Sequence, residues 1–229
     1  MPFFYDYYGY LIFVVPAMLI SLIAQIAVKS SFSKYSRVLC GHSGAEAAQA
    51  VLRANGVTGV TITRVAGNLT DHFDPRTNTI RLSDSVYDSR TISAVGVAAH
   101  EAGHAVQYAK AYKPIHIRAS ILPICNIGSQ LSMPLVLLGI VFSFPILIDL
   151  GIIFFCAVLL FQLVTLPVEL NASKRAVTAI RETHLLTSEE DIKGAKKVLR
   201  AAAMTYIAAV ITAILQLLRL ISLANRNRR

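Results

Sequence analysis

Residues 120–167 form a long apolar block in which Asp149 is the one charged residue. A transmembrane helix needs about 20 predominantly apolar residues, so this block is too long for one span and long enough for two. The second span is clearest at 150–166, and we expect the first at about 121–142. The block therefore predicts an integral membrane protein whose chain crosses the bilayer and returns.

Two further segments have the composition of transmembrane helices. Residues 10–28 are uncharged and about one bilayer long. No basic residue precedes them and no clean cleavage site follows, so we expect a retained anchor rather than a signal peptide. Residues 201–218 are the fourth candidate. The predicted fold class is a mainly α, multi-pass membrane protein with three or four transmembrane helices. Aromatic residues suited to the membrane interface occur near the first span: Phe3, Phe4, Tyr5, Tyr7, Tyr8 and Tyr10.

The basic residues predict the orientation of the chain in the membrane. Lys29, Lys34 and Arg37 follow the first span, so the positive-inside rule places this end in the cytoplasm and the N-terminus outside. The segment 170–200 is predicted to be cytoplasmic for the same reason. Its basic residues are Lys174, Arg175, Arg181, Lys193, Lys196, Lys197 and Arg200. A fourth span would leave the basic tail outside, against this rule, and the alternative is a last helix that lies at the interface.

The net charge of +9 does not indicate a nucleic-acid partner, because the basic residues lie beside apolar runs and the chain has no Trp. Residues 36–118 are mixed in composition and are expected to fold outside the bilayer. A helix is predicted within 42–57, with Ser43 as its N-cap and Asn55-Gly56 as its stop. Strands are predicted within 57–66 and 76–83, with a turn at 74–78, followed by a helix over about 90–109.

The last of these helices carries the sequence "AAHEAGHAV", with His100, Glu101 and His104. Positions four apart share one helix face, so the two imidazoles can converge on one metal ion. Glu101 points elsewhere around the helix and can reach a water molecule on that metal, which is the mechanics of the H-E-x-x-H motif. Such a pattern arises by chance in about 0.4% of chains of this composition. The alternative is a pair of core histidines satisfied by hydrogen bonds.

A catalytic zinc site usually has a third protein ligand. The sequence lacks an H-x-x-G-x-x-H extension, and His116 and His184 remain candidates. Glu169 is favoured, because it is a carboxylate at the end of an apolar span, a costly place for a charge. Pro167 is suited to the first turn of a helix that would begin there. The alternative for Glu169 is a surface glutamate near basic residues.

Three segments together resemble the neutral zinc metallopeptidases of bacterial membranes, the YugP-like family. They are "VAAHEAGHAVQ", "NLTDHFDPRTNTIRLS" before it and "PVELNASKRA" after it. The resemblance covers nearly the whole chain. It implies a zincin-like α+β catalytic domain of the gluzincin type, with one Zn²⁺ per chain held by His100, His104 and Glu169, and Glu101 as catalytic base. The wider gluzincin pattern often has Asp where this chain has Ser173.

The resemblance and the apolar runs together divide the chain into five parts. These are an N-terminal transmembrane anchor (1–29), a cytoplasmic zincin-like region with the motif helix (30–118), a transmembrane hairpin (119–168), a cytoplasmic helical segment with the third ligand (169–200), and a C-terminal transmembrane or interfacial helix with a basic tail (201–229).

Other polar residues are candidates for supporting roles. Asn171 and Ser173 could each accept an imidazole N–H and so orient a zinc-binding histidine. A peptidase also needs a donor to the oxyanion of its transition state. The candidates for that role are Tyr108, His72, His116 and Arg175. His72 could instead bind a second metal or cap the turn before Pro75. The strand at 77–83 is expected to pair with an extended substrate through its edge.

The sequence thus predicts a membrane-embedded zinc endopeptidase that hydrolyses proteins or peptides at the cytoplasmic face of the cell membrane, with Glu101 as general base. The expected partners are the substrate and the lipid bilayer, and a homo-oligomer or a membrane partner is left open. One alternative is a membrane scaffold or interaction protein whose metal site is structural. A transporter is a weaker alternative, since it would need more intramembrane charges than Asp149.

Overall fold

The computed structural model describes residues 10–227, so the predicted belt residues from Phe3 to Tyr8 lie outside the described part. The chain divides into two compact units. The first, here the membrane unit, contains the residues up to Gln25, Ile117–Pro167 and those from Thr205 on. The second, here the mixed unit, contains Ile26–His116 and Val168–Met204. Each is described by itself.

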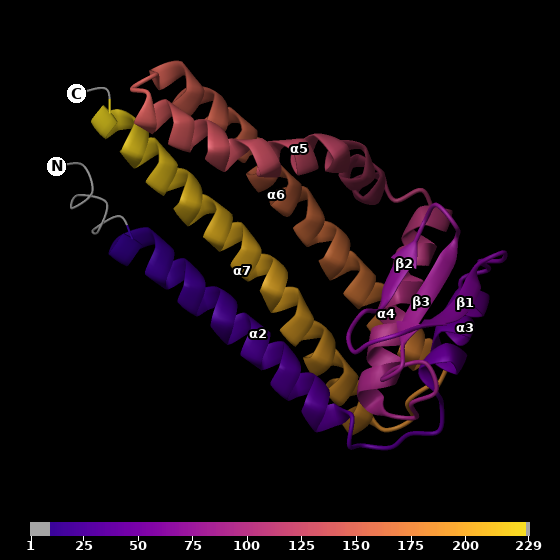
Figure 1. The fold of residues 1–229 in the computed structure, drawn as a ribbon. Helices are drawn as coiled ribbons and strands as arrows, with labels where there is room; N and C mark the ends of the chain where they lie inside the picture. Colours follow the sequence, from indigo (N-terminus) through magenta and orange to yellow (C-terminus); the bar gives the residue numbers. More distant parts are fainter. Residues whose placement is uncertain (1–9, 228–229) are drawn as a thin grey trace. The chain divides into compact units, whose positions relative to one another are not determined.

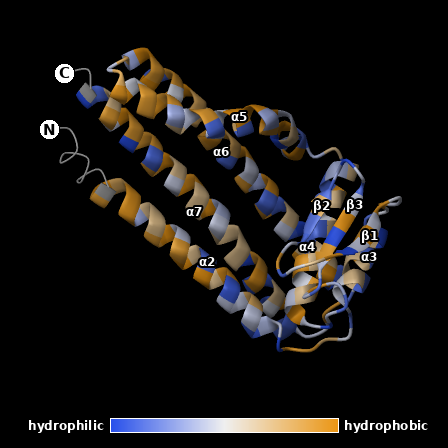
Figure 2. Cartoon of the chain, viewed as in Figure 1, coloured by the Kyte–Doolittle hydropathy of each residue, from blue (hydrophilic) through white to orange (hydrophobic). Residues whose placement is uncertain are grey.

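The membrane unit is built from parts of long helices, whose remaining residues belong to the mixed unit (Figure 1). They are a short π-helix Tyr10–Val14 that leads into α2 (Val15–Tyr35), then α5 (Lys113–Val141), α6 (Pro145–Glu182) and α7 (Glu189–Asn227). Among the described residues, four helices are long and apolar enough to cross a membrane. Hydrophobic residues predominate along these helices (Figure 2). The prediction of a mainly α, multi-pass membrane protein is confirmed, with four candidate spans.

Small residues bring α5 and α6 together within the membrane unit. A Cβ atom at Gly151 would lie 2.7 Å from the carbonyl oxygen of Ser132, so only glycine fits there. The Ser132 hydroxyl donates to the carbonyl oxygen of Gly151 at 2.8 Å, within this contact. Close backbone approach and buried side-chain hydrogen bonds are the usual means of helix association in lipid.

Prolines lie inside two of these long helices without ending them. Pro145 begins α6, but Pro123 and Pro134 lie inside α5 and Pro167 lies inside α6. The prediction that Pro167 occupies the first turn of a new helix is therefore wrong. A proline removes one backbone hydrogen bond, which a long helix at the membrane tolerates because neighbouring groups compensate. At 1.5 Å per residue, the 38 residues of α6 extend about 57 Å, well beyond the roughly 30 Å of a bilayer core.

The mixed unit begins with α3 (Gly44–Ala54), whose ends are those predicted from the sequence. The Ser43 side chain accepts a hydrogen bond from the backbone N–H of Glu46, and the Glu46 carboxylate accepts one from Ser43 N–H, which completes a capping box. The helix stops at Asn55, and Gly56 takes a positive φ of 67° that glycine adopts readily.

A three-stranded sheet follows, in the order β1-β3-β2. β1 (Thr61–Val65) is parallel to β3 (Thr79–Ser83), and β2 (His72–Asp74) is antiparallel to it. The turn between β2 and β3 is held by Asp74, which accepts from Arg76 N–H and from the Thr77 hydroxyl. β1 and β3 were predicted, but β2 was not. Because β3 is the central strand, the expectation that its edge pairs with substrate is wrong.

The core of the mixed unit surrounds α4 (Ile92–Ala109), which is buried along most of its length. The Thr91 hydroxyl caps its first turn by accepting from Ala94 N–H. The buried apolar side chains around α4 come from α3, β3, the last part of α6 and the first part of α7. Small residues predominate on α4, so neighbouring elements can approach its backbone closely.

Candidate metal centre

The motif helix α4 places two imidazoles on one face. His100 and His104 are one turn apart, and their ring centroids are separated by 4.7 Å in an edge-to-face arrangement. Glu101 and His104 are each 9% exposed, so the motif lies at the inner edge of the core rather than on the surface. The helix therefore presents the imidazoles from a rigid, buried support.

Glu169 comes to the same point from α6. Its Oε2 atom lies 3.2 Å from His100 Nε2 and 3.4 Å from His104 Nε2, and the residue is 2% exposed. One donor atom from each of the three residues lies within 4.8 Å of the others, and no other group of this kind occurs among residues 10–227. His116 and His184, the alternative third ligands, are outside the group. Two imidazole nitrogens and one carboxylate are a donor set that suits zinc.

The approach of α6 to α4 depends on Gly103, which lies between the two donor histidines and directly precedes His104. A Cβ atom at this position would lie 2.9 Å from the carbonyl oxygen of Ala172, three residues beyond Glu169. The absence of a side chain at Gly103 thus lets the α6 backbone come close enough for its carboxylate to reach the imidazoles.

The other ring nitrogen of each histidine also has a polar neighbour. Ser173 Oγ lies 3.1 Å from His100 Nδ1, so this serine contacts a candidate ligand directly. Asn171 contacts neither imidazole. Its Oδ1 accepts instead from Gln107 Nε2 at 3.0 Å and from Arg175 Nε at 2.8 Å. Gln107 then accepts a hydrogen bond from His104 at its Oε1, 3.0 Å from His104 Nδ1.

Gln107 was not singled out from the sequence. The available signal was its spacing, since it follows His104 by three residues and so lies on the same helix face. Its carboxamide is fully buried, and Nε2 donates both to Asn171 and to the carbonyl oxygen of Val168 at 2.8 Å. Gln107 therefore connects a candidate ligand on α4 with the backbone of α6 beside Glu169.

The carboxylates near His104 raise its pKa. Burial lowers the pKa of His104, but the hydrogen bond with Glu169 and the charges of Glu101 and Glu169 outweigh it and raise the pKa above its ordinary value of 6.5. A carboxylate beside two imidazoles attracts a cation, whether a proton or a metal ion. Protons and metal therefore compete for this site.

The remaining candidates, Tyr108, His116, Arg175 and His72, do not belong to the donor group. The Tyr108 ring lies 5.2 Å from the His116 ring and 5.6 Å from the Phe73 ring, measured between centroids. The Arg175 guanidinium lies 5.9 Å from the centre of the Tyr112 ring. His72 is exposed on β2, with Nδ1 2.8 Å from the carbonyl oxygen of Thr70, and it belongs to no metal-type cluster among the described residues.

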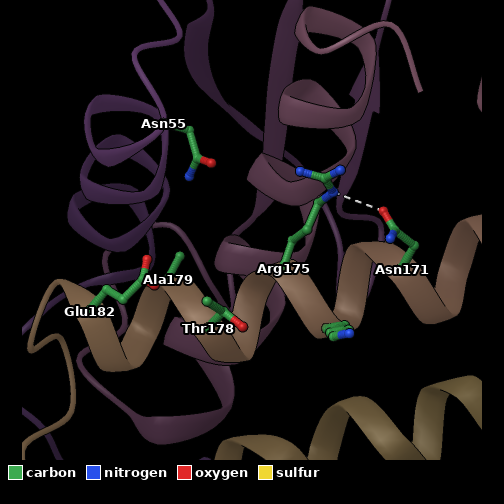
Figure 3. A pocket seen from close by; sticks show the side chains of 7 residues that line it. Asn55, Asn171, Arg175, Thr178, Ala179 and Glu182 are labelled. Atoms are coloured by element: carbon green, nitrogen blue, oxygen red, sulfur yellow. Dashed lines mark hydrogen bonds between the residues drawn. The ribbon is translucent and has the colours of Figure 1, made fainter.

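A polar pocket of about 280 Å³ lies along α6 beyond Asn171. Figure 3 shows Asn171 and Arg175 directed toward one another on this helix, with Glu182 at the other end. The donors of the metal-type cluster do not line the pocket. Its lining residues are Asn55, Asn171, Lys174, Arg175, Thr178, Ala179 and Glu182.

Within residues 10–227, four helices apolar enough to cross a membrane accompany a buried cluster of two imidazoles and one carboxylate that could hold a metal ion, as expected of a membrane protein with a metal centre. The chain belongs to the family described as "Putative neutral zinc metallopeptidase", which it matches over residues 10–225. It is 44% identical over 209 residues to the "Putative membrane protease YugP" of Bacillus subtilis (strain 168), a match that covers 90% of this chain and 92% of the relative. No solved structure matches the chain. The family resemblance drawn from the three sequence segments is confirmed.

Proposed function

We propose that this protein is a zinc-dependent membrane endopeptidase of the gluzincin type that hydrolyses peptide bonds of proteins or peptides. The observation that carries the proposal is the convergence of His100, His104 and Glu169 beside the buried Glu101. The family and the YugP relative support the same activity by their names. A structural metal site would need a fourth protein donor, and the cluster found among residues 10–227 offers three.

The residues present fit one Zn²⁺ ion. His100, His104 and Glu169 would hold it, each through the atom that faces the other two. When bound, zinc supplies a Lewis acid that polarises a peptide carbonyl and acidifies a water molecule. Three protein donors leave room for that water, as expected at a catalytic rather than a structural site.

Glu101 would act as general base and then as general acid. It is adjacent in sequence to His100, and no hydrogen bond or ion pair ties its carboxylate to another of the described residues. It can therefore accept the proton of the attacking water and return it to the leaving amine. A carboxylate bound to a neighbouring arginine or lysine would be a weaker base for that step.

The substrate is expected along β2 rather than β3. β2 is at one end of the strand order, so it offers an edge to which an extended peptide can add by backbone hydrogen bonds. Phe73 of β2 contacts Tyr108 of the motif helix, so this edge is next to the helix that bears the base. Tyr108, which contacts Phe73, and His116, whose ring packs against Tyr108, remain candidates for stabilising the oxyanion.

The active site is proposed to face the cytoplasm, with the N-terminus outside. Lys29 and Lys34 lie near the end of α2, and the polar parts of α6 and α7 in the mixed unit are rich in Lys and Arg. Basic residues concentrate on the cytoplasmic side of membrane proteins. Cysteine-accessibility labelling of engineered single cysteines in intact cells would test this orientation.

The experiment for the function compares wild type with Glu101→Gln, purified in detergent. Zinc content is measured by elemental analysis, and cleavage is followed on an unfolded protein substrate. We expect about one Zn²⁺ per chain in both, and a loss of about 10²–10⁴-fold in cleavage rate in the variant, the usual contribution of a general base. Equal cleavage rates in the two proteins would refute the assignment of Glu101.

A further inference from the structure

The buried carboxamide of Gln107 has one orientation that its partners allow. The carbonyl oxygen of Val168 is an acceptor only, so the group 2.8 Å from it must be the Nε2 donor of Gln107. Arg175 Nε is a donor only, so the atom that it reaches must be Asn171 Oδ1, which in turn requires a donor from Gln107. In the reversed orientation, Gln107 Oε1 would face the carbonyl oxygen of Val168 and Asn171 Oδ1, and no hydrogen bond can form between acceptors.

This orientation decides the tautomer of His104. With Nε2 of Gln107 engaged by Val168 and Asn171, its Oε1 faces His104 Nδ1 at 3.0 Å. Oε1 can only accept, so Nδ1 must carry the hydrogen. The lone pair of the neutral imidazole is then on Nε2, the atom that faces Glu169 at 3.4 Å.

The second histidine is not fixed in this way. The neighbour of His100 Nδ1 is the Ser173 hydroxyl, 3.1 Å away, which can either donate or accept. Ser173 therefore adapts to either tautomer of His100, whereas Gln107 permits one tautomer of neutral His104. The two candidate ligands differ in how strongly the protein prepares them for a metal.

We propose that Gln107 is a positioning residue that holds His104 ready to bind Zn²⁺ through Nε2, and that the Arg175–Asn171 hydrogen bond locks Gln107 in place. The proposal rests on the metal role of His104 in the proposed function. Partners of this kind usually contribute 10–100-fold to metal affinity, so the expected effect is measurable without any assay of catalysis. Arg175 thereby influences the site from a pocket that the donors do not line (Figure 3).

The first test measures the Zn²⁺ dissociation constant of the full-length protein by competition with a chelator of known affinity. Gln107→Met keeps a side chain of similar length and removes all three hydrogen bonds, and we expect it to weaken Zn²⁺ binding about 10–100-fold. Gln49→Met makes the same change on α3, outside this network, and is expected to bind Zn²⁺ as wild type does.

Two substitutions at Asn171 provide a test that does not depend on Gln107 variants folding. Asn171→Asp keeps an oxygen that accepts from both Gln107 and Arg175, so it should bind Zn²⁺ within about threefold of wild type. Asn171→Leu removes that acceptor, and we expect it to weaken binding about 10-fold. If the hydrogen bonds of Asn171 position Gln107, Zn²⁺ affinity should be kept in Asn171→Asp and lowered in Asn171→Leu. Packing alone does not require this difference between the two variants.

The third measurement uses NMR to determine the tautomer of His104. In protein with ¹⁵N-labelled histidines, the Zn²⁺-bound wild type should show His104 protonated at Nδ1, and Gln107→Met should show a mixture of forms or a shifted Nδ1 resonance. Equal Zn²⁺ affinity in wild type and folded Gln107→Met, or in the two Asn171 variants, would overturn the proposal. A wild-type protein that binds no Zn²⁺ would overturn the proposed function as well.

Discussion

Gly103 of α4 and Ala172 of α6 are in backbone contact, because a Cβ atom at Gly103 would lie 2.9 Å from the Ala172 carbonyl oxygen. This contact sets the distance between the helix that carries the histidines and the helix that carries Glu169. The candidate metal centre therefore depends on a residue that has no side chain to donate.

Gly103→Ala is expected to push α6 away from α4. Inserting one methyl group against backbone, rather than against a flexible side chain, should cost about 1–3 kcal/mol of unfolding free energy. It should also weaken Zn²⁺ binding, because Glu169 moves with α6. Thermal unfolding and chelator competition measure the two effects. Gly41→Ala is a matched control, since a Cβ atom there has nothing within 4 Å. A Gly103→Ala protein as stable as the control would contradict the packing argument.

Glu169→Ala should abolish stable Zn²⁺ binding, whereas His116→Ala and His184→Ala should not. The carboxylate is one of three donors within 4.8 Å, and the two other histidines are outside this cluster. We expect a loss of more than about 100-fold in affinity for Glu169→Ala, beyond what removal of an orienting partner produces. Metal content after dialysis against a defined zinc buffer gives the readout. Retention of zinc by Glu169→Ala, with loss in His116→Ala, would move the third ligand to His116.

Removal of metal is expected to lower thermal stability. A ligand that binds the folded chain stabilises it by RT ln(1 + [L]/Kd), about 2.7 kcal/mol at 100 times Kd. The melting temperature of wild type should therefore rise with Zn²⁺ concentration and fall on adding a chelator. The Glu169→Ala protein should show no such dependence, and an equal shift in both proteins would indicate zinc binding elsewhere.

Asp74 should make stability dependent on pH in the acidic range. Its carboxylate accepts from the Arg81 guanidinium, from Arg76 N–H and from the Thr77 hydroxyl, and these bonds hold its pKa well below the ordinary value of 3.8. A group with a lowered pKa stabilises the fold above its unfolded pKa and loses that contribution as the pH falls toward its folded pKa. Wild type should therefore melt higher than Asp74→Asn at pH 7, and the difference should narrow below about pH 4. A difference that stays constant from pH 7 to pH 3 would exclude this role.

Local chemistry made part of the fold predictable. Ser43, Glu46 and the Asn55-Gly56 stop define α3 through contacts between close neighbours in sequence, and the predicted ends agree with the structure. The four apolar runs predicted candidate spans because hydrophobic length needs no tertiary information. The pairing of His100 and His104 was predictable for a similar local reason, because the two residues are one helical turn apart in the sequence.

Features that depend on distant partners were missed or wrong. β2 is three residues long, too short for a periodic pattern, and it pairs with β3 only because the turn at Asp74 folds it back. Strand order is not encoded locally, so the central position of β3 was not foreseen. Gln107 was missed because its partners Val168 and Asn171 are 61 and 64 residues away in sequence. The preference of proline for a first turn predicts a helix start at Pro167, but α6 continues through it, because tolerance of an internal proline depends on tertiary surroundings.

The position of Glu169 along the chain has a consequence for biogenesis. Both imidazoles are translated before α5, and the carboxylate follows only after the apolar part of α6. At about 5–20 residues per second, several seconds of synthesis separate the two halves of the donor set. A nascent or truncated chain that ends before Glu169 has an incomplete centre. Under the proposed function, proteolytic competence would therefore arise only after α5 and the apolar part of α6 have been made.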